Sequence, residues 1–153
     1  MIAVIQRVKH ASVGVAGNVV GSCGYGLLIL LGVDVNDSDE DAQVLARKIA
    51  NLRIFTDEND KLNLSIKDIG GEALVVSNFT LLANYKKGNR PDYLNSARPE
   101  PANCLYEYFV GLMSKDVDRV EKGAFGEHME IEMLGDGPIT IVLDSNVLLN
   151  KNI

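Results

Sequence analysis

Hydrophobic and polar residues alternate along the first 35 residues of the chain and predict several β-strands. Residues 2–10 set Ile2, Val4, Gln6 and Val8 against Ile5, Arg7 and Lys9, which predicts a strand with one basic and partly exposed face. Residues 12–15 and 19–23 flank a Gly-Asn hairpin turn, and residues 25–33 form an apolar run. No helical pattern separates these segments, so we expect the strands to pair in antiparallel fashion.

Two later segments carry apolar residues at helical spacing. The first follows an acidic cluster at residues 39–41, which suits the positive end of a helix. Its apolar positions are Ala42, Leu45, Ala46, Ile49 and Leu52. The second begins at Pro99 or Pro101 and leaves Tyr106 outside its apolar stripe. That stripe comprises Ala102, Leu105, Tyr108, Phe109, Leu112 and Met113.

The segment EALVVSNFTLLA, residues 72–83, begins as an apolar strand and then becomes polar. Ser77, Asn78 and Thr80 surround a single aromatic residue, Phe79. Each buried polar group must find a partner or cost about 1 to 3 kcal/mol. A purely structural strand has no need of three such groups, so we predict that this segment lines a site.

The C-terminal part of the chain has two strand patterns, at residues 129–133 and 139–143. The sequence Gly-Asp-Gly-Pro between them is typical of a hairpin turn, and composition alone predicts a trans bond between Gly137 and Pro138. Residues 146–153 are expected to form a frayed or loosely docked tail.

These patterns together predict an α+β fold. Antiparallel sheets would form a barrel or sandwich, with two main helices packed outside. The length of 153 residues suits a single domain, which we place at residues 1–145.

The net charge of −6 excludes general attraction to a polyanion, so a nucleic-acid partner would need a local basic patch. The only concentrated positive charge that we identify lies in a loop after residue 83, which carries Lys86, Lys87 and Arg90. This loop is either a solvated surface or a phosphate-binding element. Cys23 and Cys104 match no metal or redox spacing and predict buried free thiols in a reducing cytoplasm.

No apolar run is long enough to cross a membrane, and the usual catalytic motifs are missing from the sequence. His10 and His128 have no partner at metal-binding spacing, so we expect no metal site. Ser77 or Thr80 as a nucleophile would lack a base. An enzyme with this sequence would therefore rely on backbone groups, on shape or on the chemistry of its substrate.

Several segments, in this order, resemble the D-aminoacyl-tRNA deacylase family, which includes the D-tyrosyl-tRNA(Tyr) deacylases. They are IQRV, GLLILLGV, KIANLRIF, KLNLS, GGEALVVSNFTLLA, KKGNRP, LYEYFV, KGAFGEHM and DGPITIVLDS. The family motif Ser-Gln-Phe-Thr appears here with Asn78 in place of glutamine. The motif Asn-x-Gly-Pro appears with Gly135 in place of asparagine.

The resemblance implies a cytoplasmic editing hydrolase that cleaves the ester joining tRNA to a D-amino acid, or to glycine mischarged on tRNA(Ala), and rejects L-esters. It implies a homodimer without cofactor or metal, in which each Gly137-Pro138 bond is cis and enters the pocket of the partner to judge chirality. The ribose 2′-hydroxyl would assist the attacking water. The residues expected to form the pocket and the backbone oxyanion donors, without a side-chain nucleophile, are Ser77, Phe79 and Thr80. The expected tRNA contacts are Lys86, Lys87, Arg90 and Arg7.

Two other functions remain open on the sequence. The departures at Asn78 and Gly135 give some weight to an oligomeric module that binds RNA 3′ ends or D-amino acids without cleaving them. A conventional Ser/Thr hydrolase of small esters is the other alternative. A deacylation assay with a matched pair of D- and L-aminoacyl-tRNA would separate all three functions.

Overall fold

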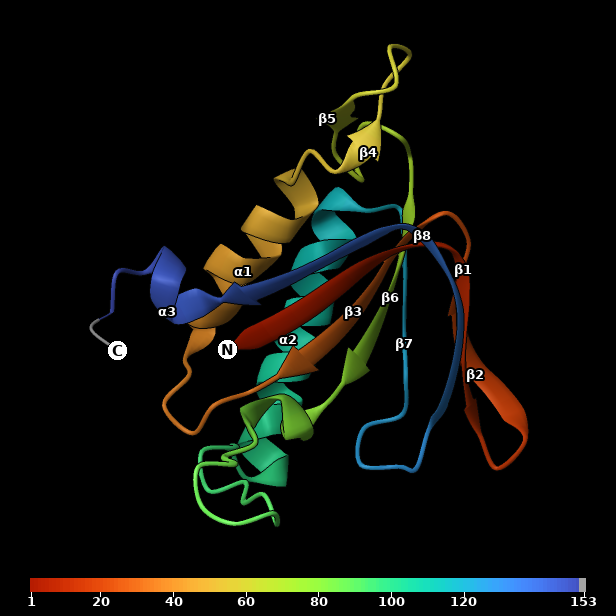
Figure 1. Ribbon diagram of the computed structural model, residues 1–153. Coiled ribbons are helices and arrows are strands. Elements are labelled where there is room, and N and C mark those ends of the chain that lie inside the picture. The colour runs from red at the N-terminus through yellow and green to blue at the C-terminus, as the bar shows by residue number, and fades with distance from the viewer. Residues whose placement is uncertain (152–153) are drawn as a thin grey trace.

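The computed structural model describes residues 1–151 and consists of one curled sheet, a small two-stranded sheet and helices packed outside (Figure 1). The strands are β1 (Ile2–Val15), β2 (Asn18–Cys23), β3 (Gly26–Gly32), β4 (Phe55–Thr56), β5 (Leu62–Leu64), β6 (Glu72–Ser77), β7 (Arg119–Lys122) and β8 (Glu130–Asp144). The helices are α1 (Asp39–Asn51), the 3₁₀ helix η1 (Phe79–Leu82), α2 (Pro99–Asp116) and α3 (Ser145–Leu148).

The main sheet has the strand order β2-β1-β3-β6-β7, with β8 paired to β1. Antiparallel pairing is confirmed for β1 with β2, β3 and β8. In contrast, β6 pairs parallel to β3, and β7 pairs parallel to β6. Parallel neighbours require a crossover, and α1 and α2 provide these two crossovers. The predicted α+β class is confirmed, with a mixed sheet in place of a purely antiparallel one.

The curl of the sheet brings β2 close to β7, so that the sheet almost closes into a barrel. The backbone amide of Ser22 on β2 donates to Glu121 Oε1 on β7 at 3.0 Å. Glu121 also pairs with Arg119, which reaches Glu72 Oε2 at 2.9 Å. This exposed charge network joins the two edges where backbone pairing stops.

Apolar side chains fill both faces of the sheet. The larger cluster lies between one face and the helices α1 and α2, which run side by side (Figure 1). Tyr106 belongs to this cluster, contrary to the sequence prediction, because its ring is buried and its hydroxyl donates to the Val75 carbonyl at 2.7 Å. A smaller cluster, which includes Val8, Leu28 and Leu74, fills the concave face.

The two cysteines differ in their surroundings, so only one of them is buried as predicted. Burial raises the pKa of Cys23 to about 11, which keeps it a neutral thiol. Cys104 is exposed on α2.

Among the residues described, no helix is long and apolar enough to span a bilayer.

The predicted hairpin near the C-terminus is wrong, because both halves of it belong to the single strand β8. Its first half pairs with the second half of β1, with Met133 opposite Ala11, and its second half continues along β1 to Asp144 opposite Ile2. The Gly-Asp-Gly-Pro segment interrupts this ladder as a bulge. Residues 136–139 stand opposite Arg7 alone, between the pairs Gly135↔Val8 and Thr140↔Gln6.

The predicted loose tail is also wrong for residues 146–151, which dock against α1. The buried Asp41 accepts from Ser145 Oγ at 2.7 Å and pairs with Lys151 Nζ at 2.8 Å. Burial alone would raise the pKa of Asp41, but hydrogen bonds from Lys151, Ser145 and Ser38 outweigh burial and lower it. The last two residues of the predicted tail, 152 and 153, lie outside the described residues.

We predict that Lys151→Ala lowers the free energy of unfolding by about 1 kcal/mol, because it leaves the buried Asp41 carboxylate with fewer donors. A carboxyl group whose pKa is lowered by folding contributes stability above its unfolded pKa of about 4 and loses it as the pH falls further. The loss caused by Lys151→Ala should therefore be measurable by urea unfolding at pH 7 and shrink in strong acid. Lys87→Ala, in the exposed loop after residue 83, is the control and should change neither the free energy of unfolding at pH 7 nor its dependence on pH.

Candidate functional site

The polar segment at residues 77–80 lies where β6 ends and the chain turns into η1. Ser77 pairs with Leu31 of β3, and the Asn78 amide donates to the Leu31 carbonyl at 2.8 Å. The Asn78 side chain then caps η1, because its Oδ1 accepts from the Thr80 amide at 3.2 Å and from the Thr80 hydroxyl. The short amide at position 78 therefore binds its own helix.

A glycine on β3 allows η1 to approach the sheet. A Cβ atom added at Gly32 would lie 2.5 Å from Leu82 Cδ2 and 3.0 Å from the Asn78 carbonyl oxygen. Both atoms belong to the turn that contains the polar segment. Any larger residue at position 32 would displace this turn.

Phe79 projects from η1 and is 57% exposed. Its ring packs edge-on against Tyr93, with ring centroids 5.0 Å apart, and Ser96 Oγ donates to its carbonyl at 3.1 Å. Both partners come from the basic loop predicted in the sequence, so this loop folds back over the site. Its cationic side chains, Lys86, Lys87 and Arg90, are exposed and make no ion pair among the described residues.

The backbone amides of the polar segment differ in their availability. The amides of Asn78 and Thr80 already have acceptors within the chain. The Phe79 amide, which lies between them, has no acceptor among residues 1–151. It is the donor that remains for a ligand. The Thr80 hydroxyl is engaged by Asn78, which does not suit a nucleophile.

The bulge of β8 presents Gly137 and Pro138 at the surface, and the bond between them is cis. Composition alone predicts trans, whereas the resemblance implies cis. Asparagine is expected at position 135, but the glycine there does not open a gap. A Cβ at Gly135 would only touch Gln6 Nε2 at 3.6 Å.

Arg7 holds this bulge from beneath and is buried, with 7% of its surface exposed. Its Nε donates to the Asp136 carbonyl at 3.2 Å and pairs with Asp136 Oδ2 at 3.1 Å, while its Nη1 donates to the Ile54 carbonyl at 3.0 Å. The guanidinium of Arg7, which was expected to contact tRNA, is therefore engaged with partners inside the protein. No local pattern in the sequence pairs Arg7 with Asp136, because the two residues are distant along the chain.

The two motifs are far apart within one chain. Ser77 pairs with Leu31, which pairs with Ala3, whereas the bulge lies opposite Arg7. Ala3 and Arg7 are four residues apart on β1, which is roughly 13 Å along the strand. A single chain therefore does not bring Phe79 and Pro138 into one pocket.

Comparisons with known proteins place this geometry in context. Residues 4–144 match the family model described as D-Tyr-tRNA(Tyr) deacylase. The chain is 55% identical to a D-aminoacyl-tRNA deacylase of Caldicellulosiruptor saccharolyticus, over 95% of this chain and 97% of the relative. It is 50% identical to a D-aminoacyl-tRNA deacylase of Dehalococcoides mccartyi, over 100% of both chains.

Two solved structures share the architecture. One is the c-Myc DNA Unwinding Element Binding Protein, with a TM-score of 0.89 and 38% identity, which covers 94% of this chain and 98% of that chain. The other is a probable eukaryotic D-amino acid tRNA deacylase, with a TM-score of 0.79 and the same coverage. At 16% identity, the second shows similarity of fold alone.

We predict that Arg7→Ala lowers the free energy of unfolding by about 2 to 3 kcal/mol, because it leaves Asp136 and the Ile54 carbonyl without their donor. Arg7→Lys should recover only part of this loss, since an ammonium group lacks the planar fork that serves several acceptors. Urea unfolding measures both changes. Arg90→Ala, in the exposed loop, is the control, and an equally small effect of Arg7→Ala would contradict the bracing role.

Proposed function

The chain belongs to the D-Tyr-tRNA(Tyr) deacylase family, and from this membership we propose how it acts as a D-aminoacyl-tRNA hydrolase. It cleaves the ester between a D-amino acid and the terminal adenosine of tRNA, and it also clears glycine from mischarged tRNA(Ala). The products are free tRNA and the free amino acid. The observation that carries the mechanism is the Phe79 amide, which has no acceptor among residues 1–151. The neighbouring Thr80 hydroxyl already donates to Asn78 Oδ1.

Catalysis in this proposal needs no side-chain nucleophile. Water adds to the ester carbonyl, and the developing oxyanion accepts a hydrogen bond from the Phe79 amide. One such donor is worth about 100- to 1,000-fold in rate. The ribose 2′-hydroxyl relays a proton from the water to the departing 3′-oxygen. Ser77 and Thr80 shape the pocket, and the exposed Phe79 ring contacts the terminal adenosine.

Chirality requires a rigid wall, because D- and L-esters carry the same chemical groups. An apolar pocket distinguishes one methylene by only about 1 to 3 kcal/mol. We propose that the carbonyls of Gly137 and Pro138 hold the substrate α-amino group and leave space for a hydrogen atom but not for an L side chain. Glycine passes this filter because it has no side chain.

The wall must come from a second subunit, since Pro138 and Phe79 are separated within one chain. The proposed homodimer is supported by β8, whose outer edge has no partner strand among the described residues. That strand exposes the apolar side chains of Ile131, Met133, Leu134 and Val142. Pairing across this region would let each bulge enter the pocket of the other subunit.

The tRNA body needs contacts beyond the pocket. Lys86, Lys87 and Arg90 extend from the loop that packs on Phe79, and they are available for phosphates near the bound 3′ end. The proposed location is the cytoplasm, where aminoacyl-tRNA is used.

The decisive test is deacylation of D-tyrosyl-tRNA and L-tyrosyl-tRNA by the purified chain. We predict that the D-ester is released at least 100-fold faster, because the L side chain meets the Gly137-Pro138 wall. Release of amino acid is followed by acid precipitation of labelled aminoacyl-tRNA. Equal cleavage of both esters would contradict the steric filter, and binding without cleavage would indicate a non-enzymatic module.

We predict that Thr80→Ala retains most of the activity, within about twofold, because the hydroxyl only donates to Asn78. Asn78→Ala should cost more in kcat, about 10- to 100-fold, since η1 loses its cap and the Phe79 amide loses its fixed direction. Rapid-quench assays on D-tyrosyl-tRNA measure both. A covalent acyl-enzyme trapped on Thr80 would overturn this assignment.

A further inference from the structure

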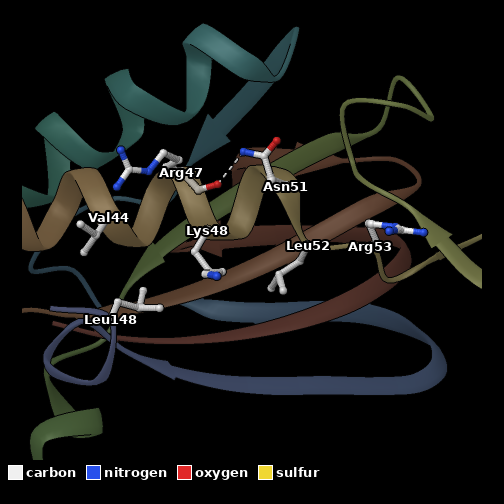
Figure 2. A pocket seen from close by; sticks show the side chains of 7 residues that line it. All are labelled: Val44, Arg47, Lys48, Asn51, Leu52, Arg53 and Leu148. Atoms are coloured by element: carbon white, nitrogen blue, oxygen red, sulfur yellow. Dashed lines mark hydrogen bonds between the residues drawn. The ribbon is translucent and has the colours of Figure 1, made fainter. Parts of the chain in front are cut away.

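The second half of α1 and the strand that follows it form a basic stretch in an acidic protein. Residues 42–56 contain Arg47, Lys48 and Arg53 and no aspartate or glutamate. These cations line a groove of about 530 Å³. We call it the α1 groove, and its lining residues are Val44, Arg47, Lys48, Asn51, Leu52, Arg53 and Leu148 (Figure 2).

The cationic groups of the α1 groove are available for a ligand. Arg47 and Lys48 are exposed, and their side chains make no ion pair among the described residues. Arg53 uses its Nε for the Asn63 carbonyl at 2.9 Å, which leaves its terminal nitrogens free of acceptors within residues 1–151. Val44, Leu52 and Leu148 lie among these groups (Figure 2). An apolar floor with several cations suits a sugar-phosphate chain.

One end of the α1 groove, at Arg53, lies near the bulge that carries Gly137 and Pro138. Arg53 directly precedes Ile54 in the chain. The carbonyls of Ile54 and of Asp136, which lies in the bulge, both accept hydrogen bonds from the Arg7 guanidinium. In the proposed homodimer, this bulge enters the partner's pocket, so the α1 groove lies beside a bound substrate. The charge at the other end of α1 has the opposite sign, because Asp37, Asp39 and Glu40 line a separate groove there. That end repels RNA.

We propose that the α1 groove binds the phosphate backbone of the tRNA acceptor end. This inference rests on the proposed function and adds a second tRNA contact to the basic loop at residues 86–90. Arg47 and Lys48 contact successive phosphates, and Arg53 directs the strand toward the bulge. This surface was not predicted from the sequence, because Lys48 in the last turn of a helix is also explained by the helix dipole.

The test is the double variant Arg47→Gln/Lys48→Gln, measured by the salt dependence of binding to uncharged tRNA. Loss of two phosphate contacts should reduce the slope of log K against log salt by about 1.4 to 1.8 and weaken binding roughly tenfold or more at 0.1 M salt. Lys115→Gln, in the last turn of α2, is the matched control and should leave the slope unchanged. An unchanged slope in the double variant would overturn the proposal.

A second readout separates RNA contact from a structural role. On D-tyrosyl-tRNA the double variant should raise KM about as much as it weakens binding, with kcat at saturation unchanged. A lower melting temperature with unaltered tRNA affinity would assign both cations to the helix and overturn the proposal. Inorganic phosphate at equal ionic strength should not displace tRNA, and displacement would indicate a simple anion site instead.

Binding of uncharged tRNA does not depend on deacylation. A wild-type chain that binds tRNA through the α1 groove but spares D-tyrosyl-tRNA would reject the proposed function and keep this inference. If the wild-type chain cleaves D-tyrosyl-tRNA but the double variant keeps the wild-type salt slope, the proposed function stands and this inference is rejected.

Discussion

The buried guanidinium of Arg7 is the interaction on which the arrangement of this molecule depends. A charge with 7% exposure is tolerated only when it is paired and hydrogen-bonded. Its partners come from the β8 bulge and from the segment after α1, so one side chain fixes both relative to β1. Residues 136–139 face only Arg7 in the ladder, so without the Arg7 side chain they would lose their anchor to β1.

This anchor explains how a surface bulge acts as a rigid wall in the proposed mechanism. Steric rejection of an L side chain works only if the wall cannot retreat, because a small shift would admit both enantiomers. Asp136 is held through both its carbonyl and its carboxylate, immediately before Gly137 and Pro138. A side chain at position 135 is not required for this rigidity, so the glycine found there is compatible with the proposed role.

Local patterns in the sequence predicted most of the elements but not their partners. Both long helices were found, since periodicity and turn residues are local signals. The strands of the first 35 residues were found too, except that residues 2–10 and 12–15, predicted as separate strands, form the single strand β1. The hairpin predicted at Gly135 was wrong because Gly and Pro mark an interruption of a strand as well as its end. The pairs Arg7–Asp136 and Asp41–Lys151 join residues more than 100 positions apart, and no local pattern reveals them. The polar segment at residues 77–80 was identified, but which amide stays free depends on the Asn78 cap.

That cap has a consequence for the chemistry. A glutamine at position 78 would be one methylene longer, whereas Asn78 reaches its own helix and occupies both the amide and the hydroxyl of Thr80. Among the described residues, the segment then has one backbone amide without an acceptor, at Phe79. An aminoacyl ester is an activated bond with a neighbouring 2′-hydroxyl, so positioning and one oxyanion donor supply what the protein must add. In the proposed mechanism, selectivity depends on the wall from the partner, so different subunits of the proposed dimer govern rate and chirality.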